Sequence, residues 1–515
     1  MKIIKNLTFA ALAVTLLSPL PASAADEANH EVWMIDQSNT YDSDANGTLD
    51  SGGTIYIYDG KDLAASPQKI DLGGAIAEQI KLTTGTVPAR PHIISFNASQ
   101  THAIVSFVAS GHVLIFDAAT RTPVFVVDVG AQAHAALPSP DETYILVANQ
   151  NGKLVHRINT DYLHNAFALD TNATLDLATG TTPSGALKQD DGVTQVNLRP
   201  DNAPIHAMPD ATSALGFVTL RGGGMFVVNP RVSPMAIVGE FTKATIQPAG
   251  LMAMQKDDTL YFNSGGGLAT LGFQSILYRL PVSAFSTTPN PTPDSPAPVV
   301  VFDHTARPEK DSHGVTLTKH ERYLWVADRA ANRVIVVDTA RHSVVNEINV
   351  TGLVSADPAP DLLALSPSGN RVYVTLRGPN PLSGNNPVVN NAKGSTPGLG
   401  VIRVERAGMT GTLQARFAIS NLDGAGVERA DPHGVAVRIP PLLVTIRASQ
   451  VEVCWNSTSN LTYQVQYRSD LTTNLWTSLN CVRSTGSKSC LSDPIVVGQP
   501  QRLYRVVQTN CVPSL

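Results

Sequence analysis

The chain of 515 residues is several times longer than a typical single domain, although all-β repeat folds often exceed that length as one unit. Only 15% of the residues are charged, and 38 glycines and 35 prolines are spread along the chain, which favours short strands joined by many turns. The net charge is −5, and no segment clusters Lys and Arg with aromatic residues. Nucleic acid is therefore excluded as an expected partner.

The first residues have the features of a secretory signal. Lys2 and Lys5 precede an apolar run from Leu7 to Leu17, and the small residues Ala22-Ser23-Ala24 follow. An uncleaved membrane anchor is the weaker alternative, because a span needs about twenty apolar residues. We expect residues 1–24 to be removed and the mature chain to be secreted or periplasmic, with no membrane span.

An internal repeat of about 45 residues dominates the chain after this signal. Each unit has a short first strand, a polar turn, an apolar second strand, a third strand and a fourth strand. The first strands are expected to start near His92, His134, His206, Gly250, His313, Asp361 and His433. A unit of this length and strand content is typical of one blade of a β-propeller.

The two ends of the repeat region complete each other. The N-terminal end supplies only three strands, 32–36, 54–59 and 68–72, whereas the C-terminal end supplies only a first strand, 432–437. Joined, they would form one blade from both ends of the chain and leave no exposed strand edge. We therefore predict an all-β fold, with a seven-bladed β-propeller over residues 25–440.

Several segments also resemble a known family. Pro-His-Gly-Val-Ala at 432–436, Leu-Ser-Pro-Ser-Gly-Asn at 365–370 and Val-Ile-Val-Val-Asp-Thr at 334–339 are similar to the YVTN family of seven-bladed β-propellers. The resemblance covers residues 30–438. It implies the fold but not one activity, because related propellers bind partners, carry copper sites or hydrolyse lactones.

Residues 441–515 depart from the repeat and resemble a fibronectin-type-III-like β-sandwich. All four cysteines lie in this segment, which in an oxidising compartment favours two disulfides. Three pairings are possible. Cys481 and Cys490 flank a turn-like stretch, so we expect a Cys481–Cys490 hairpin cross-link, which leaves Cys454 to pair with Cys511.

Histidine recurs at the start of the first strands. It occupies His92, His134, His206, His313 and His433, and Asp361 takes the equivalent place in another blade. First strands are innermost in a propeller, so these side chains would converge on one mouth of the channel, where imidazoles suit copper or zinc. The alternative is that the rings bond to the backbone and only support the fold.

Hairpin geometry predicts partners for these residues. His313 should lie near Asp328 and His433 near Asp36, while Asp361 should lie near Arg377. By the same reasoning, we expect His134 to face Asn149 and His206 to face Arg221. Arg221 and Arg377 would then be placed to bind carboxylates, with a solvated rim as the alternative.

A second candidate ion site lies near the N-terminus. Asp42, Asp44, Asn46 and Asp50 have the oxygen spacing of a calcium loop, with Gly47 at the turn. The twelfth position is Gly53 and not the bidentate Glu of an EF-hand. Weak calcium binding and an exposed hairpin tip are the two hypotheses.

These patterns favour an exported, monomeric, non-enzymatic propeller that binds a small ligand, a metal or a protein through its His-rich mouth. One alternative is an enzyme, either a lactonase-like hydrolase or a copper-dependent oxidoreductase, that uses His313 or His433 as base or ligand. Another is a surface adhesion protein that makes contacts through loops 180–202 and 378–398. The sequence contains no Cys-x-x-Cys-His or Gly-x-Ser-x-Gly motif.

Overall fold

The computed structural model describes residues 28–266, 274–382, 384, 392–441, 443–447, 450–469, 475–494 and 502–513, with the backbone alone at 443–447. The expected signal, residues 1–24, lies outside the described residues. Part of the loop 378–398 lies outside them as well.

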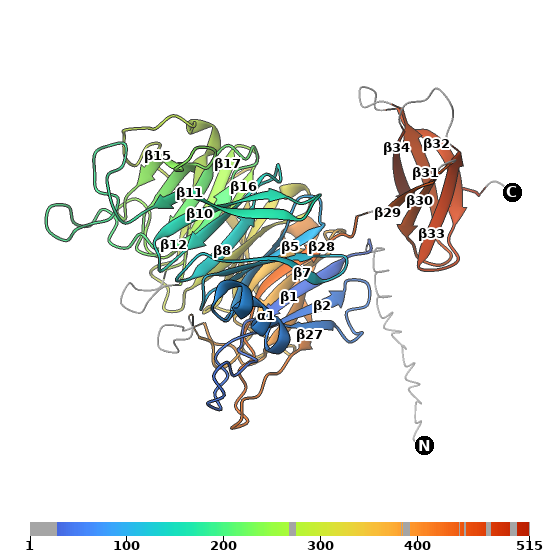
Figure 1. Cartoon of the computed structure of the whole chain (residues 1–515), viewed down its shortest axis with the longest axis horizontal. Coiled ribbons are helices and arrows are strands. Elements are labelled where there is room, and N and C mark those ends of the chain that lie inside the picture. Colours follow the sequence, from blue (N-terminus) through green and yellow to red (C-terminus); the bar gives the residue numbers. More distant parts are fainter. Residues whose placement is uncertain are drawn as a thin grey trace, which may run out of the picture.

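Seven four-stranded antiparallel sheets make up most of the described chain (Figure 1). Their first strands contact one another in the cyclic order β28, β4, β8, β12, β16, β20, β24 and back to β28. These first strands are β4 (Pro91–Phe96), β8 (Ala133–Pro138), β12 (Pro204–Pro209), β16 (Gly250–Lys256), β20 (Ser312–Leu317), β24 (Pro360–Leu365) and β28 (Pro432–Arg438). A closed circle of such sheets around a channel is a β-propeller, which confirms the predicted fold class.

The other strands of each sheet follow outward from the channel. The second strands are β1 (Glu31–Asp36), β5 (His102–Phe107), β9 (Tyr144–Asn149), β13 (Gly216–Leu220), β17 (Thr259–Ser264), β21 (Tyr323–Asp328) and β25 (Arg371–Leu376). The third strands are β2 (Thr54–Asp59), β6 (His112–Asp117), β10 (Leu154–Asp161), β14 (Met225–Asn229), β18 (Ile276–Pro281), β22 (Arg333–Asp338) and β26 (Gly398–Glu405). The outer strands are β3 (Gln68–Asp71), β7 (Thr122–Asp128), β11 (Ala166–Asp176), β15 (Ala236–Phe241), β19 (Val299–Asp303), β23 (Ser343–Asn349) and β27 (Thr410–Ala418).

One sheet is built from both ends of the repeat region, as the sequence predicted. Its strand order is β28-β1-β2-β3, and β28 pairs antiparallel with β1 from Glu31 opposite Arg438 to Asp36 opposite Pro432. An ion pair of 3.0 Å between Arg438 Nη1 and Glu31 Oε2 links the same two strands. The pairing closes the circle, so no first strand is left with an open neighbour.

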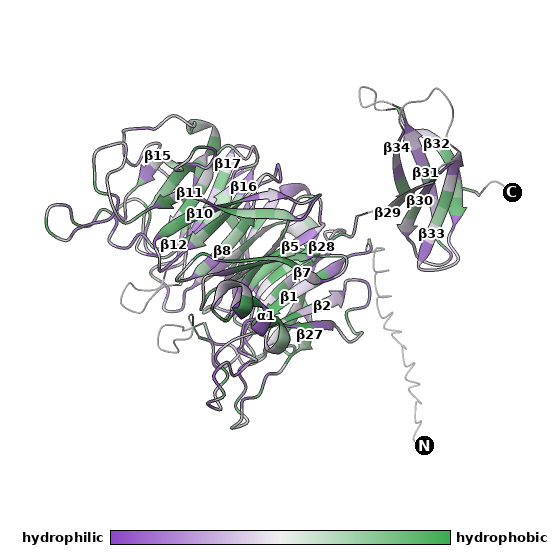
Figure 2. Ribbon diagram, viewed as in Figure 1, coloured by the Kyte–Doolittle hydropathy of each residue, from purple (hydrophilic) through white to green (hydrophobic). Residues whose placement is uncertain are grey.

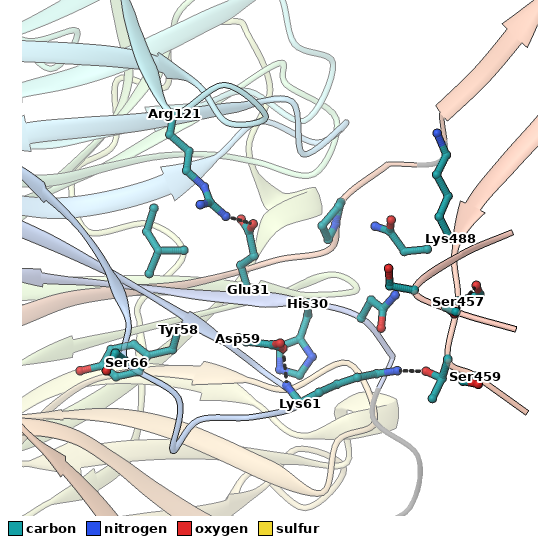
Figure 3. Close-up of a pocket in the computed structure, with 17 residues that line it drawn as sticks. His30, Glu31, Tyr58, Asp59, Lys61, Ser66, Arg121, Ser457, Ser459 and Lys488 are labelled. Carbon is teal, nitrogen blue, oxygen red and sulfur yellow. Dashed lines mark hydrogen bonds and ion pairs between the residues drawn. The ribbon is translucent and has the colours of Figure 1, made fainter. Parts of the chain in front are cut away.

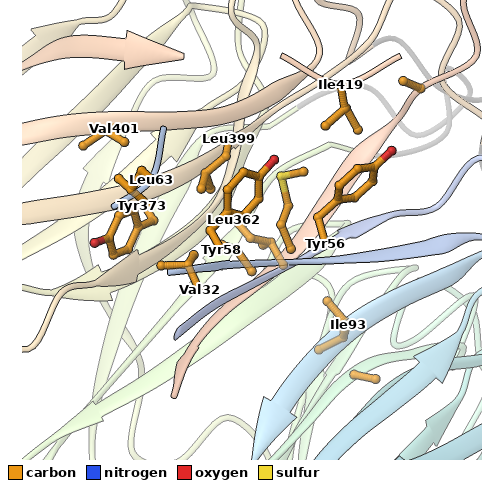
Figure 4. Packing of buried hydrophobic residues seen from close by; sticks show 14 residues of the cluster. Val32, Tyr56, Tyr58, Leu63, Ile93, Leu362, Tyr373, Leu399, Val401 and Ile419 are labelled. Carbon is orange, nitrogen blue, oxygen red and sulfur yellow. The ribbon is translucent and has the colours of Figure 1, made fainter. Parts of the chain in front are cut away.

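The strands are mostly hydrophobic, while many loops are hydrophilic (Figure 2). One core cluster joins the closing sheet to the sheet of β24–β27, with Val32, Tyr58, Tyr373 and Leu399 among its buried members (Figure 4). Each strand is short because a blade needs only about five residues to cross the disc. Burial of both sheet faces accounts for the near-continuous apolar strands.

The helix α1 (Gly74–Thr84) connects β3 to β4 and packs on β7. Short 3-10 turns cover Val282–Ala284, Lys319–Glu321 and Arg406–Gly408. Within the described ranges, no helix has the length and apolar character that crossing a bilayer requires.

The C-terminal segment forms two three-stranded sheets around a small core that includes Trp455 and Val465. One sheet has the order β29-β30-β33 and the other β32-β31-β34. The strands are β29 (Leu443–Arg447), β30 (Gln450–Asn456), β31 (Thr462–Arg468), β32 (Thr477–Arg483), β33 (Lys488–Pro494) and β34 (Leu503–Gln508).

The disulfides correct the sequence prediction. Cys454 pairs with Cys490 and Cys481 with Cys511, in place of the expected Cys481–Cys490 and Cys454–Cys511 bonds. The expected hairpin does not exist, because β32 and β33 belong to different sheets. Cys490 instead lies directly opposite Cys454 on β30, and their Cα atoms are 4.1 Å apart.

A polar cleft of about 720 Å³ lies between strands β1 and β2 of the closing sheet and the C-terminal segment (Figure 3). His30, Glu31, Lys61 and Arg121 line one side. Lys61 Nζ donates a hydrogen bond of 2.8 Å to Thr458 Oγ1 across it. None of the channel residues predicted from the sequence lines this cleft.

Candidate functional site

A β-bulge recurs near the start of every first strand. In β20, Ser312 pairs with Asp328 and Val315 with Val326, so two residues of β20 stand opposite one residue of β21. The register shifts by one extra residue at the same place in β4, β8, β12, β16, β24 and β28. A bulge bends the strand and redirects a side chain. This irregularity lies at the position of the recurrent histidines.

Side chains of the second strands hold the redirected backbone. Ser106, Asn263 and Thr375 donate hydrogen bonds to the carbonyl oxygens of His134, His313 and His433, at 3.0, 2.8 and 2.7 Å. In each case the carbonyl belongs to the next sheet around the circle. Each bulge is therefore fixed by its neighbour, and the channel residues are positioned by contacts between sheets.

Glycine allows two of these strands to approach the next one closely. A Cβ atom at Gly314 would lie 2.3 Å from the carbonyl oxygen of Asp361, and one at Gly434 would lie 2.6 Å from that of His92. The His-Gly pairs of the sequence thus have a steric cause. The side chains of His313 and His433 reach groups of the neighbouring sheets because no Cβ keeps the strands apart.

Four of the five histidines, His92, His134, His313 and His433, are linked by ring contacts. The ring centroids of His433 and His92 are 3.7 Å apart with the rings stacked, and those of His92 and His134 are 4.5 Å apart, edge to face. His313 and His433 have centroids 5.2 Å apart. His206 on β12 is also buried.

His92 has a defined tautomer. Gln37 Nε2 donates to Asp431 Oδ2 at 2.8 Å, so the amide oxygen of Gln37 faces His92 Nδ1, also at 2.8 Å. An amide oxygen only accepts hydrogen bonds, so His92 Nδ1 carries the proton. Its Nε2 therefore has a bare lone pair, and that buried atom has no hydrogen-bond partner.

His433 has the same tautomer. Its Nδ1 lies 3.2 Å from the carbonyl oxygen of His92, which again only accepts, so the proton is on Nδ1. The lone pair on its Nε2 lies 3.7 Å from Asp361 Oδ2. A lone pair and a carboxylate oxygen repel each other unless a cation lies between them.

Asp361 also lies against His313. Asp361 Oδ1 and His313 Nδ1 are 2.8 Å apart, yet neither atom makes a hydrogen bond of acceptable geometry. Ligand atoms on one metal ion are typically about 3 Å apart and point at the ion, not at each other. His313, Asp361 and His433, from three consecutive sheets, offer ligand atoms within 4.8 Å of one another.

An alternating series of buried charges surrounds Asp361. Arg377 binds Asp361 Oδ2 at 2.7 Å through Nη1 and Asp431 Oδ1 at 2.6 Å through Nε. Arg90 Nη2 pairs with Asp431 Oδ2 at 2.7 Å, and Arg329 Nη2 lies 2.9 Å from Asp311 Oδ2. Arg329 also lies 3.5 Å from Asp361. These ion pairs fix Oδ2 of Asp361 and leave Oδ1 toward His313.

Most residues of this charged series were not predicted from the sequence. Asp311, Arg90 and Asp431 lie just before first strands, and Arg329 lies just after a second strand. Gln37 likewise follows β1. Their recurrence at these two positions of the repeat is a signal that could have revealed them, because both positions open on the same end of the channel.

Burial keeps the channel imidazoles neutral. It lowers the pKa of His134 to about 3 and that of His206 to about 4, and neighbouring imidazoles add to the effect. Burial and the adjacent rings hold the pKa of His92 well below its usual value. For Asp361, burial alone would raise the pKa, but the adjacent histidines and arginines hold it well below the ordinary range. A carboxylate beside neutral imidazoles is the state that binds metal.

Four of the predicted hairpin partners are off by one residue or more. Ser312, not His313, stands opposite Asp328, and Pro432, not His433, stands opposite Asp36. Ala133 faces Asn149, and His206 faces Thr219 instead of Arg221. The bulges cause the error at His313, His433 and His134, because they add one residue to the first strand. His206 lies in the regular part of its hairpin, so its predicted register was wrong by two residues. The predicted contact of Asp361 with Arg377 is confirmed.

The supporting residues have other partners. Asp36 Oδ1 accepts from the backbone of Asp431 at 2.8 Å, and Asp328 Oδ1 accepts from the backbone of Asp311 at 2.8 Å. Arg221 Nε binds Asp201 at 2.6 Å. Since Arg221 and Arg377 are both neutralised by carboxylates, their use in holding an anion stays a prediction.

The acidic loop near the N-terminus bonds mainly to itself. Asp42 accepts from the backbone of Asn46 and Gly47, and Asp50 accepts from that of Ser43. Among the described residues, its carboxylates do not form a group of ligand atoms within 4.8 Å of one another. Calcium binding there stays a prediction.

Apolar side chains follow the channel residues along the first strands. Met252 packs against a cluster that contains Ile93, Ala135 and Leu362, each of which follows a channel His or Asp in the sequence. None of the described members of that cluster comes from β12 or β20, the neighbours of β16. Met252 therefore reaches a cluster beyond its neighbouring strands, and it also packs against the cluster that contains Val315 of β20.

No family model matches the chain, and no curated protein matches it. Among solved structures, a hypothetical selenium-binding protein from Sulfolobus tokodaii is similar at 11% identity and a TM-score of 0.52, with 80% of this chain and 94% of that chain covered. A protein from Lactobacillus plantarum is similar at 11% identity and 0.50, with 80% and 100% covered. The periplasmic gluconolactonase of Pseudomonas aeruginosa has 14% identity and a TM-score of 0.47, with 80% and 100% covered. At these identities the likeness shows the fold alone.

Proposed function

We propose that this protein is an exported metal-binding propeller that holds one divalent transition ion, zinc or copper, in its channel. The ligands are side-chain atoms of His313, Asp361 and His433, and the ring of His92, whose Nε2 is unpartnered, is stacked on that of His433. The observation that carries the proposal is a buried group of ligand atoms on His313, Asp361 and His433, in which neither His313 Nδ1 nor Asp361 Oδ1 has a hydrogen-bond partner.

The cost of such an arrangement supports a cation. An unpartnered buried imidazole nitrogen costs about 1–3 kcal/mol, and His92 Nε2 is such an atom. The hydrogen bonds from Nδ1 of His92 and of His433 fix both rings in the tautomer that presents Nε2. Metal-bound histidines are commonly oriented in this way by an amide or carbonyl acceptor on the other nitrogen.

The donor set selects the class of ion. Two imidazoles and one carboxylate suit zinc and copper(II), whereas calcium and magnesium prefer oxygen ligands. By the general order of affinities, copper(II) should bind more tightly than zinc. The ion pairs of Asp361 with Arg377 and Arg329 offset the negative charge on Oδ2, so the carboxylate serves as a single-oxygen ligand.

Export belongs to the same proposal. The sequence of residues 1–24 has the form of a secretory signal, and both cysteine pairs of the C-terminal segment are oxidised. The proposal treats residues 25–440 as a YVTN-like seven-bladed unit and 441–515 as an accessory fibronectin-III-like module. A mature N-terminus at Ala25 in protein from the periplasmic fraction would support it.

The metal site is tested by stoichiometry. The purified full-length mature protein, stripped with a chelator and titrated separately with Zn²⁺ and Cu²⁺, should bind one equivalent of either ion by calorimetry and elemental analysis. The His313→Ala/His433→Ala double variant should lose at least about 100-fold in affinity for both ions.

A matched control keeps the test specific. His164→Ala removes an exposed imidazole beside Asp161, far along the chain from the channel residues, and should bind one equivalent as the natural protein does. Circular dichroism of the double variant checks that it is folded. Failure of the natural protein to retain one equivalent of either ion would overturn the proposal.

A further inference from the structure

The sheet β32-β31-β34 of the C-terminal segment has one face on the small core and one face turned away from it. Tyr463 and Val465 are buried in that core, so the alternate residues of β31 point to the outer face. The registers with β32 and β34 place the residues opposite them on the same face. We call the polar part of this surface the arginine face, which comprises Gln464, Gln466, Arg468, Ser478, Arg483 and Arg505.

The arginine face is positively charged. Strands β31, β32 and β34 contain three arginines, Arg468, Arg483 and Arg505, and no aspartate or glutamate. Residues 441–515 hold six lysines and arginines against three aspartates and glutamates, whereas the whole chain has a net charge of −5. A negatively charged partner is therefore attracted to this segment and repelled by the rest of the molecule.

Hydrogen bonds hold the polar side chains of the arginine face in a row. Gln464 Nε2 donates to Ser478 Oγ at 3.0 Å, and Gln466 Nε2 donates to Gln464 Oε1 at 3.0 Å. Arg505 Nε donates to Gln466 Oε1 at 2.6 Å. The last bond uses only Nε, so the exposed Arg505 side chain keeps two Nη groups for a partner. The row runs across all three strands and offers amide and hydroxyl groups beside a guanidinium.

Trp476 holds two of the guanidinium groups. The Cζ atom of Arg468 lies 4.7 Å from the centroid of its ring, and that of Arg505 lies 4.3 Å from it. Guanidinium groups stack on aromatic rings and keep their in-plane N–H donors available while stacked. The two charges therefore lose little further freedom when an anion binds, which favours affinity.

The positions of the arginines favour an extended ligand. Arg483 stands opposite Thr462, and Arg468 lies six residues further along β31, so the two arginine backbones are about 20 Å apart. One small anion reaches only one of these positions, whereas a linear chain with repeated anionic groups reaches both. The amide side chains in between donate and accept hydrogen bonds, which suits the hydroxyl groups of sugars better than the acyl chains of a lipid.

We propose that the arginine face binds a linear acidic polysaccharide. The three arginines pair with its carboxylates, and the two glutamines bond to its hydroxyl groups. The described residues of the C-terminal segment that line the cleft toward the propeller come from β30, β33 and the loops, and none of them belongs to the arginine face. Binding there attaches the propeller to a carbohydrate surface. The inference does not depend on the proposed metal site.

Binding is measured by calorimetric titration of the full-length mature protein with polygalacturonate, a linear chain of carboxylated sugars. Arg483→Gln/Arg505→Gln should lose at least about 10-fold in affinity, because each substitution removes charge-assisted hydrogen bonds. Arg447→Gln/Lys488→Gln removes the same net charge from the other sheet, on β29 and β33, and should bind within about 2-fold of the natural protein. Raising the salt concentration should weaken binding.

The controls distinguish the polysaccharide from other anionic partners. Dextran, a neutral polysaccharide, should not bind, and circular dichroism of both double variants checks that they are folded. Equal losses in the two double variants would overturn the inference, because they would reduce it to net charge, as would the absence of polygalacturonate binding by the natural protein. Tighter binding to vesicles of phosphatidylglycerol and phosphatidylcholine, or to single-stranded DNA, than to polygalacturonate would overturn it as well.

Discussion

The first strands β16 and β20 are neighbours with the same backbone plan but opposite chemistry. Both have the bulge at the same place, and in both a side chain of the preceding sheet donates to the backbone carbonyl: Thr219 to Leu251 at 2.8 Å and Asn263 to His313 at 2.8 Å. Yet β16 presents Leu251 and Met252 where β20 presents His313 and Gly314. The bulge and its hydrogen bond therefore belong to the fold, and the proposed metal ligands lie on a backbone arrangement that also exists without them.

The residue at the second position of the bulge also differs between β16 and β20. Met252 reaches a cluster beyond its neighbouring strands, whereas Gly314 lies where any side chain would collide with the backbone of Asp361. The close approach of β20 to β24 brings His313 within 2.8 Å of Asp361. The second bulge position is apolar in β16, whereas in β20 it is a glycine that lets the strand approach β24 closely.

The largest expected loss of stability comes from Gly314→Ala, which removes the glycine that distinguishes β20 from β16. The added Cβ would lie 2.3 Å from the Asp361 carbonyl oxygen, and such overpacking costs about 3 kcal/mol in unfolding free energy or more. Met252→Ala removes a much larger group from a partly exposed position and should cost only about 1–2 kcal/mol. Urea unfolding of the two variants measures both costs. An equal or smaller loss for Gly314→Ala would contradict the steric role of the glycine.

A second prediction concerns the free-energy cost of the buried carboxylate of Asp36. Burial raises the pKa of Asp36 from 3.8 to about 6. Its protonated form is favoured in the folded state, so this group stabilises the fold below about pH 4 and loses that contribution as the pH rises through 6. The difference amounts to about 3 kcal/mol.

Asp36→Asn should therefore be more stable than the natural protein at pH 7.5 and about equal to it at pH 4. The amide oxygen of the substituted side chain can still accept from the backbone of Asp431, as the Asp36 carboxylate does. Denaturant unfolding at the two pH values measures the slope. A stability difference independent of pH would show that Asp36 keeps its ordinary pKa.

The smallest expected effect on stability comes from the hydrogen bonds that support β28 and β16. Thr375 Oγ1 donates to the His433 carbonyl at 2.7 Å, as Thr219 does to that of Leu251 at 2.8 Å. Replacing either by valine leaves a buried carbonyl unpaired and should cost about 1–2 kcal/mol. Only Thr375→Val should also weaken zinc binding, by about 10-fold in calorimetry. Equal zinc affinities in the two variants would mean that the carbonyl support does not position His433.

Much of this architecture can be predicted from sequence patterns within a single repeat. The repeat length, the apolar strands and the complementary ends predicted the propeller and its closing sheet, because each blade is a local unit of four consecutive strands. The recurrence of histidine at His92 and His313 predicted that these residues share one end of the channel. Both inferences use only the position of a residue within its own repeat.

The side chains that these histidines contact could not be predicted in the same way. Counting along a hairpin assigned Asp328 to His313, but one bulged residue shifts the register, and the partner is Asp361 on the next sheet. The predicted cysteine pairing was wrong for a related reason: Cys481 and Cys490 are near in sequence but belong to different sheets.

The amino-acid sequence by itself determined the strands, their order and the end of the channel at which imidazoles collect, since these follow from periodicity and steric preference within short segments. Tertiary structure alone decided which imidazole meets which carboxylate and which thiols join. Those choices depend on how closely neighbouring sheets approach, and that distance is set by Gly314 and Gly434 together with the alternating arginines and aspartates at the mouth.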